Sequence, residues 1–324
     1  MRAYSSSNRR RGNHPFVLFP YRALIELQRI PVLTILVSLL CIGVFVAQSN
    51  SERALSEAAV AHCDQEEGRG FRQALQRVAG SSDPQTCVAL MLMLANSSDE
   101  RAALGRIVER LGTGSRLGDQ RLAAYYEQSL LDSYRTFRRS APSNLTARLA
   151  YRPDSWNPLR MLSAAVAHGS WSHLIGNLIF FYAFAATIEM LLGPLLYVAV
   201  LVILALGTHS VYSLAMMQDS LALPTVGLSG VVMGVIALFV YFIPQARIRC
   251  VLWLLVFFYR FSLPAWLLAT WYVGWDLYAI FSTEAKGGVN LVAHLSGAAL
   301  GLALGATLFR QKRHWAQELV EEPG

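Results

Sequence analysis

The sequence predicts an all-α, polytopic membrane protein: a bundle of six transmembrane helices, with a small helical domain outside the membrane inserted between the first and second helices. The chain of 324 residues is 54% hydrophobic and only 15% charged. A helix needs about 20 apolar residues to cross the hydrocarbon core of a bilayer. The apolar residues gather in blocks free of Asp, Glu, Lys and Arg: Ile30–Ser51, Trp171–Ile188, Met190–Gln218, Ser220–Ala246, Phe261–Trp275 and Gly287–Phe309.

The position of the basic residues predicts the topology. The net charge of +7 could indicate a nucleic-acid partner, but Arg and Lys cluster beside the apolar blocks. Six crossings place three basic segments on one side, and basic residues near helix ends mark the cytoplasmic face. We therefore expect no nucleic-acid partner, and both termini in the cytoplasm at a bacterial inner (plasma) membrane. The residues are Arg2, Arg9, Arg10, Arg11, Arg22 and Arg29; Arg247, Arg249 and Arg260; and Arg310, Lys312 and Arg313.

The N-terminal segment predicts a basic cytoplasmic tail over residues 1–30 and a first transmembrane helix over 31–48. Within the tail, "YRALIELQRI" is a candidate for lying along the membrane surface. A cleaved signal peptide is the alternative, with Pro31–Val46 as its apolar core. The basic lead-in of about thirty residues is long for a signal peptide, and no clean small-x-small cleavage site follows. An uncleaved signal anchor is therefore favoured.

Residues 49–155 predict an extracytoplasmic helical insert domain, because the segment is too long for a simple connection. Its helical periods are broken by turns containing Gly, Ser, Asp and Pro, which indicates four or five short amphipathic helices. Cys63 and Cys87 both lie in it, and a disulfide persists in an oxidising compartment. That bond would stabilise the domain by roughly 3 kcal/mol; two unpaired buried thiols are the alternative.

A serine framed by glycines opens the fourth apolar block, in "PTVGLSGVVMGVIALFVYF" over residues 224–242. The fourth helix runs from the outside inward, so Ser229 is expected near its outer end. The sixth helix also enters from the outside, and His294 is its one ionisable residue. The two residues are therefore expected at similar depth, and an ionisable residue inside a span indicates function.

Glycines at four-residue spacing predict that the fourth and sixth helices pack closely. Gly297, Gly301 and Gly305 follow His294, while Gly230 and Gly234 follow the serine. Stripes of small residues let two helix backbones approach in lipid. If these stripes meet, Ser229 and His294 come within hydrogen-bond reach; taken singly, all of these residues could serve only packing.

A serine beside a histidine predicts nucleophilic catalysis, because the imidazole can take the hydroxyl proton from an otherwise weak nucleophile. Gly227 would let the chain turn tightly before Ser229. The helix N-terminus offers free N–H groups where an oxyanion would form. His173 and Asn177 share one face of the second helix and could donate hydrogen bonds to the same oxyanion, or could be packing polar residues.

Three motifs together resemble the rhomboid intramembrane serine proteases: Gly-Leu-Ser-Gly from 227, Ala-His-x-x-Gly-x-x-x-Gly from 293, and His-x-x-x-Asn from 173. The resemblance covers about 156–310, expected to form a catalytic core of five transmembrane helices, with a cytoplasmic tail over 311–324. It implies a serine endopeptidase with Ser229 as nucleophile, His294 as general base and no acidic third member. The oxyanion hole would comprise the Ser229 N–H, His173 and Asn177. No metal and no cofactor are expected.

The sequence departs from the family pattern at two positions. Met233 stands where the family often has an aromatic residue under the histidine ring, and Leu159 precedes Arg160 where Trp-Arg is common. The insert has no counterpart in the minimal family architecture. Gly227, Gly230, Met233, Gly297 and Gly301 are expected to support the site. His168 is expected to brace the outer segment, and His209, Asp276 and Glu189 are expected to be structural.

The resemblance implies cleavage of single-span transmembrane proteins near the outer membrane face. A helical peptide bond must be extended before attack, so substrates would carry small or helix-weakening residues near the top of their spans. The first alternative is a catalytically inactive rhomboid-like protein that binds transmembrane helices. The second is a small transporter with Asp276 and the histidines along a polar path.

Overall fold

The computed structural model describes residues 17–23, 29–66, 68–97, 99–109, 117–217, 223–254, 257–281 and 290–321, and these are mostly helical. Most of the predicted N-terminal tail and the last residues of the C-terminal tail lie outside these ranges. The chain divides into two compact units. One contains Val46–Arg148 and the other contains the preceding first helix segment and Leu149–Gly324.

The described residues of the unit containing Val46–Arg148 form helices joined by short turns, and α1 (Val32–Gln65) extends into it. The first helix therefore does not end at residue 48 but continues to Gln65, because no Pro or Gly interrupts the Ala-, Glu- and Leu-rich segment after the apolar block. The remaining helices are α2 (Arg69–Ala79), α3 (Pro84–Ala95), α4 (Glu100–Glu109), α5 (Leu117–Ser140) and α6 (Leu145–Leu149).

Local signals set the ends of these helices. Asp83 caps α3 by accepting a hydrogen bond from the Thr86 N–H at 2.6 Å, and Pro84 occupies the first helical turn. Gly80 ends α2 in the left-handed conformation, with φ of 79°. The helices enclose their own apolar core, which includes Leu55, Phe71, Leu75, Met91, Leu94, Leu104, Leu130 and Phe137.

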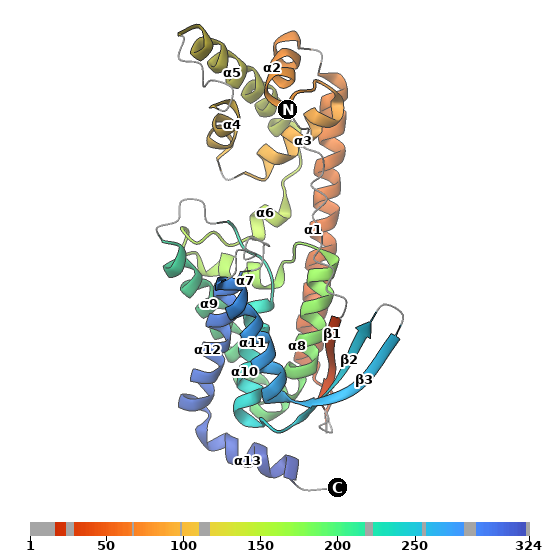
Figure 1. The fold of residues 1–324 in the computed structure, drawn as a ribbon, viewed down its shortest axis with the longest axis vertical. Helices are drawn as coiled ribbons and strands as arrows, with labels where there is room; N and C mark the ends of the chain where they lie inside the picture. Colours follow the sequence, from red (N-terminus) through yellow and green to blue (C-terminus); the bar gives the residue numbers. More distant parts are fainter. Residues whose placement is uncertain are drawn as a thin grey trace. The chain divides into compact units, whose positions relative to one another are not determined.

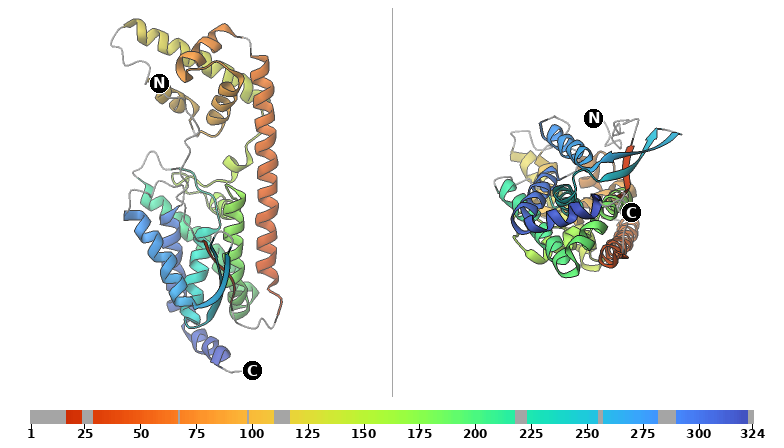
Figure 2. Two further views of the ribbon diagram at one scale, coloured as in Figure 1. Left: turned by 45° about the vertical axis from the view of Figure 1, so that its right-hand side comes forward. Right: turned by 90° about the horizontal axis from the view of Figure 1, so that it is seen from below.

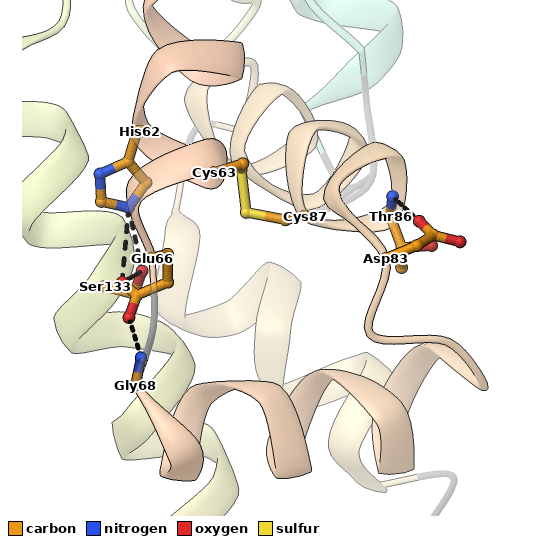
Figure 3. Close-up of a disulfide and its surroundings, with 8 residues drawn as sticks. All are labelled: His62, Cys63, Glu66, Gly68, Asp83, Thr86, Cys87 and Ser133. Carbon is orange, nitrogen blue, oxygen red and sulfur yellow. Dashed lines mark hydrogen bonds and ion pairs between the residues drawn. A yellow bond between two sulfur atoms is a disulfide. The ribbon is translucent and has the colours of Figure 1, made fainter.

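A disulfide and a polar cluster tie α1 to its neighbours in this unit (Figure 3). Cys63 on α1 is bonded to Cys87 on α3, with the two Cα atoms 5.8 Å apart. One residue earlier on α1, His62 Nε2 lies 3.0 Å from Ser133 Oγ on α5. The Ser133 hydroxyl donates to Glu66 at 2.8 Å, so it is engaged by both side chains.

The second unit contains the other apolar helices: α7 (Pro158–Val166), α8 (Trp171–Leu192), α9 (Pro194–Met216), α10 (Ser229–Phe242), α11 (Ala265–Phe281), α12 (Leu291–Leu308) and α13 (Arg310–Glu321). Among the described residues, α1, α8, α9 and α12 are long and apolar enough to cross a membrane. Helices α10 and α11 fall in the fourth and fifth predicted blocks but have 14 and 17 residues. At 1.5 Å per residue, α10 spans only about 21 Å, so the count of six spans stays a prediction.

Helix α10 lies at the centre of this unit. Nearly all of its side chains are buried, and it packs against α12, α8, α9 and α11. The cyan and blue helices α10, α11 and α12 run alongside one another in Figure 1 and in the left view of Figure 2. Among these neighbours, α8, α11 and α12 carry the other candidate residues.

A three-stranded antiparallel sheet interrupts the helical fold, in the order β1 (Val17–Ala23), β2 (Arg247–Leu254) and β3 (Phe257–Pro264) (Figure 1). In the register of this sheet, Arg249 of β2 lies opposite Arg22 of β1 on one side and Ser262 of β3 on the other. The prediction of an all-α chain is wrong here. The segments "RIRCVLWL" and "FFYRFSLP" are rich in β-branched and aromatic residues that favour strands. Consequently α11 begins at Ala265, four residues inside the predicted fifth block.

Glu189 fixes the start of α1 against α8. Its carboxylate accepts hydrogen bonds from the backbone N–H groups of Leu33 and Thr34 at 2.9 and 2.7 Å, and from the Thr34 hydroxyl at 2.7 Å. These donors are the ones that a helix N-terminus leaves unpaired. Glu189 is therefore a capping residue, consistent with the structural role expected of it.

Candidate active site

Helices α10 and α12 meet with their backbones in contact along the glycine stripes. A Cβ added to Gly230 would lie 3.1 Å from the Ala293 carbonyl oxygen. A Cβ on Gly297 would collide with the Gly230 carbonyl oxygen, and one on Gly301 with that of Gly234. At Gly297 and Gly301, no other residue type fits without moving a backbone. The packing predicted from the four-residue spacing is present, and it places the residue after Ser229 against the residue before His294.

The chain before Ser229 is held in a fixed turn. Gly227 has φ of 132°, a conformation that favours glycine, and its N–H donates to the Ala164 carbonyl of α7 at 2.9 Å. Two residues earlier, Thr225 exchanges backbone hydrogen bonds with Tyr151 at 2.9 and 3.0 Å. Ser229 is the first residue of α10, so its N–H is one of the unpaired donors at a helix N-terminus.

The start of α12 is tied to the same turn. The Asn290 side chain accepts from the Ala293 N–H at 3.0 Å and donates to the Thr225 hydroxyl at 3.2 Å. Asn290 thus caps α12 and links it to the segment that leads into Ser229. This link sets the first turn of α12, including His294, level with the first turn of α10.

The structure describes both Ser229 and His294, and the hydrogen bond expected between them is not present. Instead, His294 Nδ1 lies 2.9 Å from Asp276 Oδ2 on α11, and the two side chains are 15% and 14% exposed. Asp276 was expected to be structural because it lies near the end of a span. The signal that could have identified it is that it is the one charged residue of α11, and His294 is the one ionisable residue of α12.

His173 and Asn177 lie beside the turn that leads to Ser229. A Cβ added to Gly227 would lie 2.7 Å from His173 Cε1 and 3.8 Å from Asn177 Nδ2. The Asn177 side-chain amide nitrogen is buried and has no hydrogen-bond partner in the described parts of the chain. A buried donor without a partner is costly. Its position near Ser229 is therefore suited to an acceptor that arrives only with substrate.

His168 and Ser170 support His173. The Ser170 hydroxyl accepts from the His173 N–H at 3.2 Å and caps α8, while the His168 and His173 rings meet edge to face at 5.2 Å. Burial, followed by the charge of His173, lowers the pKa of His168 to about 4. His168 is therefore neutral near pH 7 and acts as a packing partner for the candidate oxyanion donor.

The remaining polar residues do not join this site. His209 Nδ1 lies 2.7 Å from the Ala205 carbonyl oxygen of its own helix, and its ring packs on Tyr151. Its neighbour Ser210 donates to the sulfur of Met161. Met233 lies one turn after Ser229 and is buried, so no aromatic ring occupies that position.

Comparison with known proteins identifies the part of the chain that carries these residues. The family model of the rhomboid domain matches residues 155–311. The matched range contains Ser229, His294, Asp276, His173 and Asn177, and it leaves out nearly all of the predicted insert. No curated protein and no solved structure gives a match.

Proposed function

Because the chain belongs to the rhomboid family, we propose that it is an intramembrane serine endopeptidase with Ser229 as nucleophile and His294 as general base. Two observations about the same end of α10 carry the proposal. The backbone contact between Gly230 and Ala293 brings the first turns of α10 and α12 together, and the polar groups of His173 and Asn177 border the turn before Ser229.

The chemistry follows from the groups gathered at this point. The Ser229 hydroxyl oxygen attacks the peptide carbonyl carbon, and His294 takes the hydroxyl proton. The carbonyl oxygen gains negative charge, which the Ser229 N–H, His173 and Asn177 stabilise by hydrogen bonds. The imidazolium then gives its proton to the leaving amine, and water hydrolyses the acyl-enzyme ester. Asn177 can donate at once, because its side-chain amide nitrogen has no other partner in the described structure.

The substrates we propose are single-span transmembrane proteins cut near the outer face of the membrane. The reacting bond must leave its helix before Ser229 can attack it, so small or helix-weakening residues near the top of the span favour cleavage. In this proposal the chain crosses a bacterial inner membrane six times with both termini in the cytoplasm. Besides these substrates, the lipid bilayer is then the other partner of the chain.

We place the 49–155 insert outside the cytoplasm. The Cys63–Cys87 disulfide supports this side, because disulfides persist in oxidising compartments and are rare in the cytosol. The insert would then lie on the same side as the Ser229 end of α10, where it can influence which substrates reach the site.

A catalytically inactive, helix-binding protein is the second candidate. The observation that favours it is the contact of His294 with Asp276 in place of Ser229. Against it, hydrogen bonds between catalytic groups are often long or absent before substrate binds, and both the serine and the histidine are present.

Cleavage of a transmembrane reporter in proteoliposomes tests the proposal. The unmodified chain should cut the reporter, and Ser229→Ala and His294→Ala should each abolish cutting, because the two residues act as one unit. Ser210→Ala is the matched control on α9, since Ser210 contacts Met161 and not the site; it should keep full activity. Cleavage that survives Ser229→Ala would exclude the assignment.

The oxyanion donors should have a smaller effect. His173→Ala and Asn177→Ala should each lower kcat by on the order of 10²–10³, because the Ser229 N–H remains. Steady-state cleavage rates of the folded variants provide the measurement. A variant with wild-type kcat would show that the residue serves packing only.

A further inference from the structure

We infer that Asp276 is a positioning residue that completes the catalytic pair as a Ser229–His294–Asp276 triad, an inference that rests on the proposed function. Its carboxylate accepts a hydrogen bond from His294 Nδ1 at 2.9 Å. An imidazole with its proton on Nδ1 has Nε2 as the acceptor nitrogen. The contact thus selects the tautomer in which Nε2 can take the serine proton.

The contact is a specific pairing. Asp276 is on α11 and His294 is on α12, and both side chains are about six-sevenths buried, at 14% and 15% exposure. Across the described residues, neither side chain makes another hydrogen bond or ion pair. A charged side chain within a span is costly and is kept where it has a partner. Asp276 therefore has one role available in this structure, and that role is directed at the candidate base.

The position of the pair fits the reaction. When the Ser229 oxygen forms its bond to the carbonyl carbon, its O–H bond breaks and the proton passes to His294 Nε2. The ring becomes an imidazolium, and the Asp276 carboxylate stabilises it while remaining ionised. The proton then leaves with the amine, and the ring returns to the same tautomer. Asp276 never touches the substrate.

The same contact would have the opposite effect if it restrained the histidine ring. A carboxylate that holds the ring away from Ser229 would slow the reaction, and its removal would then speed it. The direction of the change in rate after substitution therefore decides between orientation and restraint.

The experiment compares Asp276→Asn and Asp276→Glu with Thr270→Ala in the full-length protein. Thr270 is on the same helix, and among the described residues its hydroxyl donates only to the Trp266 carbonyl, so its variant controls for a polar change on α11. Two rates are measured: fluorophosphonate labelling of Ser229 and cleavage of a transmembrane reporter, the latter resolved into kcat and KM. The thermal unfolding midpoint in detergent shows that each variant is folded.

We expect Asp276→Asn to lower the labelling rate and kcat by on the order of 10²–10⁴, with KM and the unfolding midpoint unchanged. Asp276→Glu should recover part of the lost rate, because it restores a carboxylate, and Thr270→Ala should match the wild type. A structural role would instead lower the midpoint without recovery by Glu.

Three results would overturn the inference: an Asp276→Asn variant with the wild-type rate, one with a higher rate, or a loss in rate that follows the unfolding midpoint. All three leave the proposed function standing, since the wild type still labels and cuts. A wild-type chain that does neither would remove the proposed function and this inference together.

Discussion

The two compact units hold their helices together by opposite means. Where α10 meets α12, side chains are absent: Gly230, Gly234, Gly297 and Gly301 bring two backbones into contact. In the Val46–Arg148 unit the helices are held apart by large side chains, such as Phe71, Met91 and Phe137, and are joined by a disulfide.

In the topology proposed above, the difference reflects the solvent of each unit. Lipid offers no hydrophobic gain for bringing two apolar helices together, so close packing between small residues must supply the attraction. In water, burial of apolar side chains drives association, and a disulfide adds stability to a small unit. A site that depends on the α10–α12 contact should therefore be sensitive to one added methyl group, and insensitive to changes in the disulfide unit.

The largest effect on activity should follow from Gly297→Ala. The added Cβ would collide with the Gly230 carbonyl oxygen, and separating the backbones would shift Ser229 relative to His294. We expect a loss of stability of about 1–3 kcal/mol and loss of most reporter cleavage, measured by thermal unfolding and cleavage rate. Gly274→Ala is the control, because a Cβ there meets nothing within 4 Å among the described atoms. Equal behaviour of the two variants would contradict the importance of the contact.

An effect on stability alone, confined to the other unit, should follow from replacing Cys63 and Cys87 together by Ser. Loss of the disulfide should destabilise the Val46–Arg148 unit by about 3 kcal/mol, which limited proteolysis would detect as faster cutting within that unit. Labelling of Ser229 should keep its wild-type rate. A parallel loss of labelling would show that the disulfide unit supports the site.

The smallest effect concerns pH. Burial lowers the pKa of His168 from its ordinary 6.5 to about 4, so the unfolded chain binds more protons between those values. The stability from this residue is complete above pH 6.5 and falls as the pH drops toward 4. We expect a decrease of roughly a few degrees in the unfolding midpoint of the rhomboid domain, and His168→Gln should remove it.

The Val46–Arg148 unit should respond at lower pH. Hydrogen bonds from Ser81 and Thr86 lower the pKa of Asp83 below its ordinary 3.8, so the stability from this carboxylate is lost only as the pH falls through that lowered value. If the unfolding midpoint of this unit fell over the same pH range as that of the rhomboid domain, the expected difference between the two units would be contradicted.

Much of the candidate site could be predicted because small residues on one face of a helix recur at a regular spacing in the sequence. The spacing of Gly297 and Gly301 on one helix and of Gly230 and Gly234 on another identified both faces of a contact that the structure contains. Gly227 was also expected in a tight turn, and the structure gives it φ of 132°.

The partner of His294 could not be predicted from spacing. Asp276 lies on a third helix, 18 residues earlier in the sequence, and no periodicity relates the two residues. The available signal was that Asp276 is the one charged residue of α11 and His294 the one histidine of α12. Whether they pair depends on how α11 is rotated about its own axis, and side-chain packing decides that rotation. The β1–β2–β3 sheet was missed for a similar reason, because the pairing of β1 with β2 joins segments more than 200 residues apart.

The most direct test of the central claim is fluorophosphonate labelling of the detergent-solubilised protein, with the modified residue identified by mass spectrometry. If Ser229 is a nucleophile activated by His294, the wild-type chain should carry one adduct, on Ser229, and Ser229→Ala and His294→Ala should carry none while keeping the wild-type unfolding midpoint. A folded wild-type chain without an adduct, or an adduct that persists in the His294→Ala variant at the wild-type rate, would contradict it.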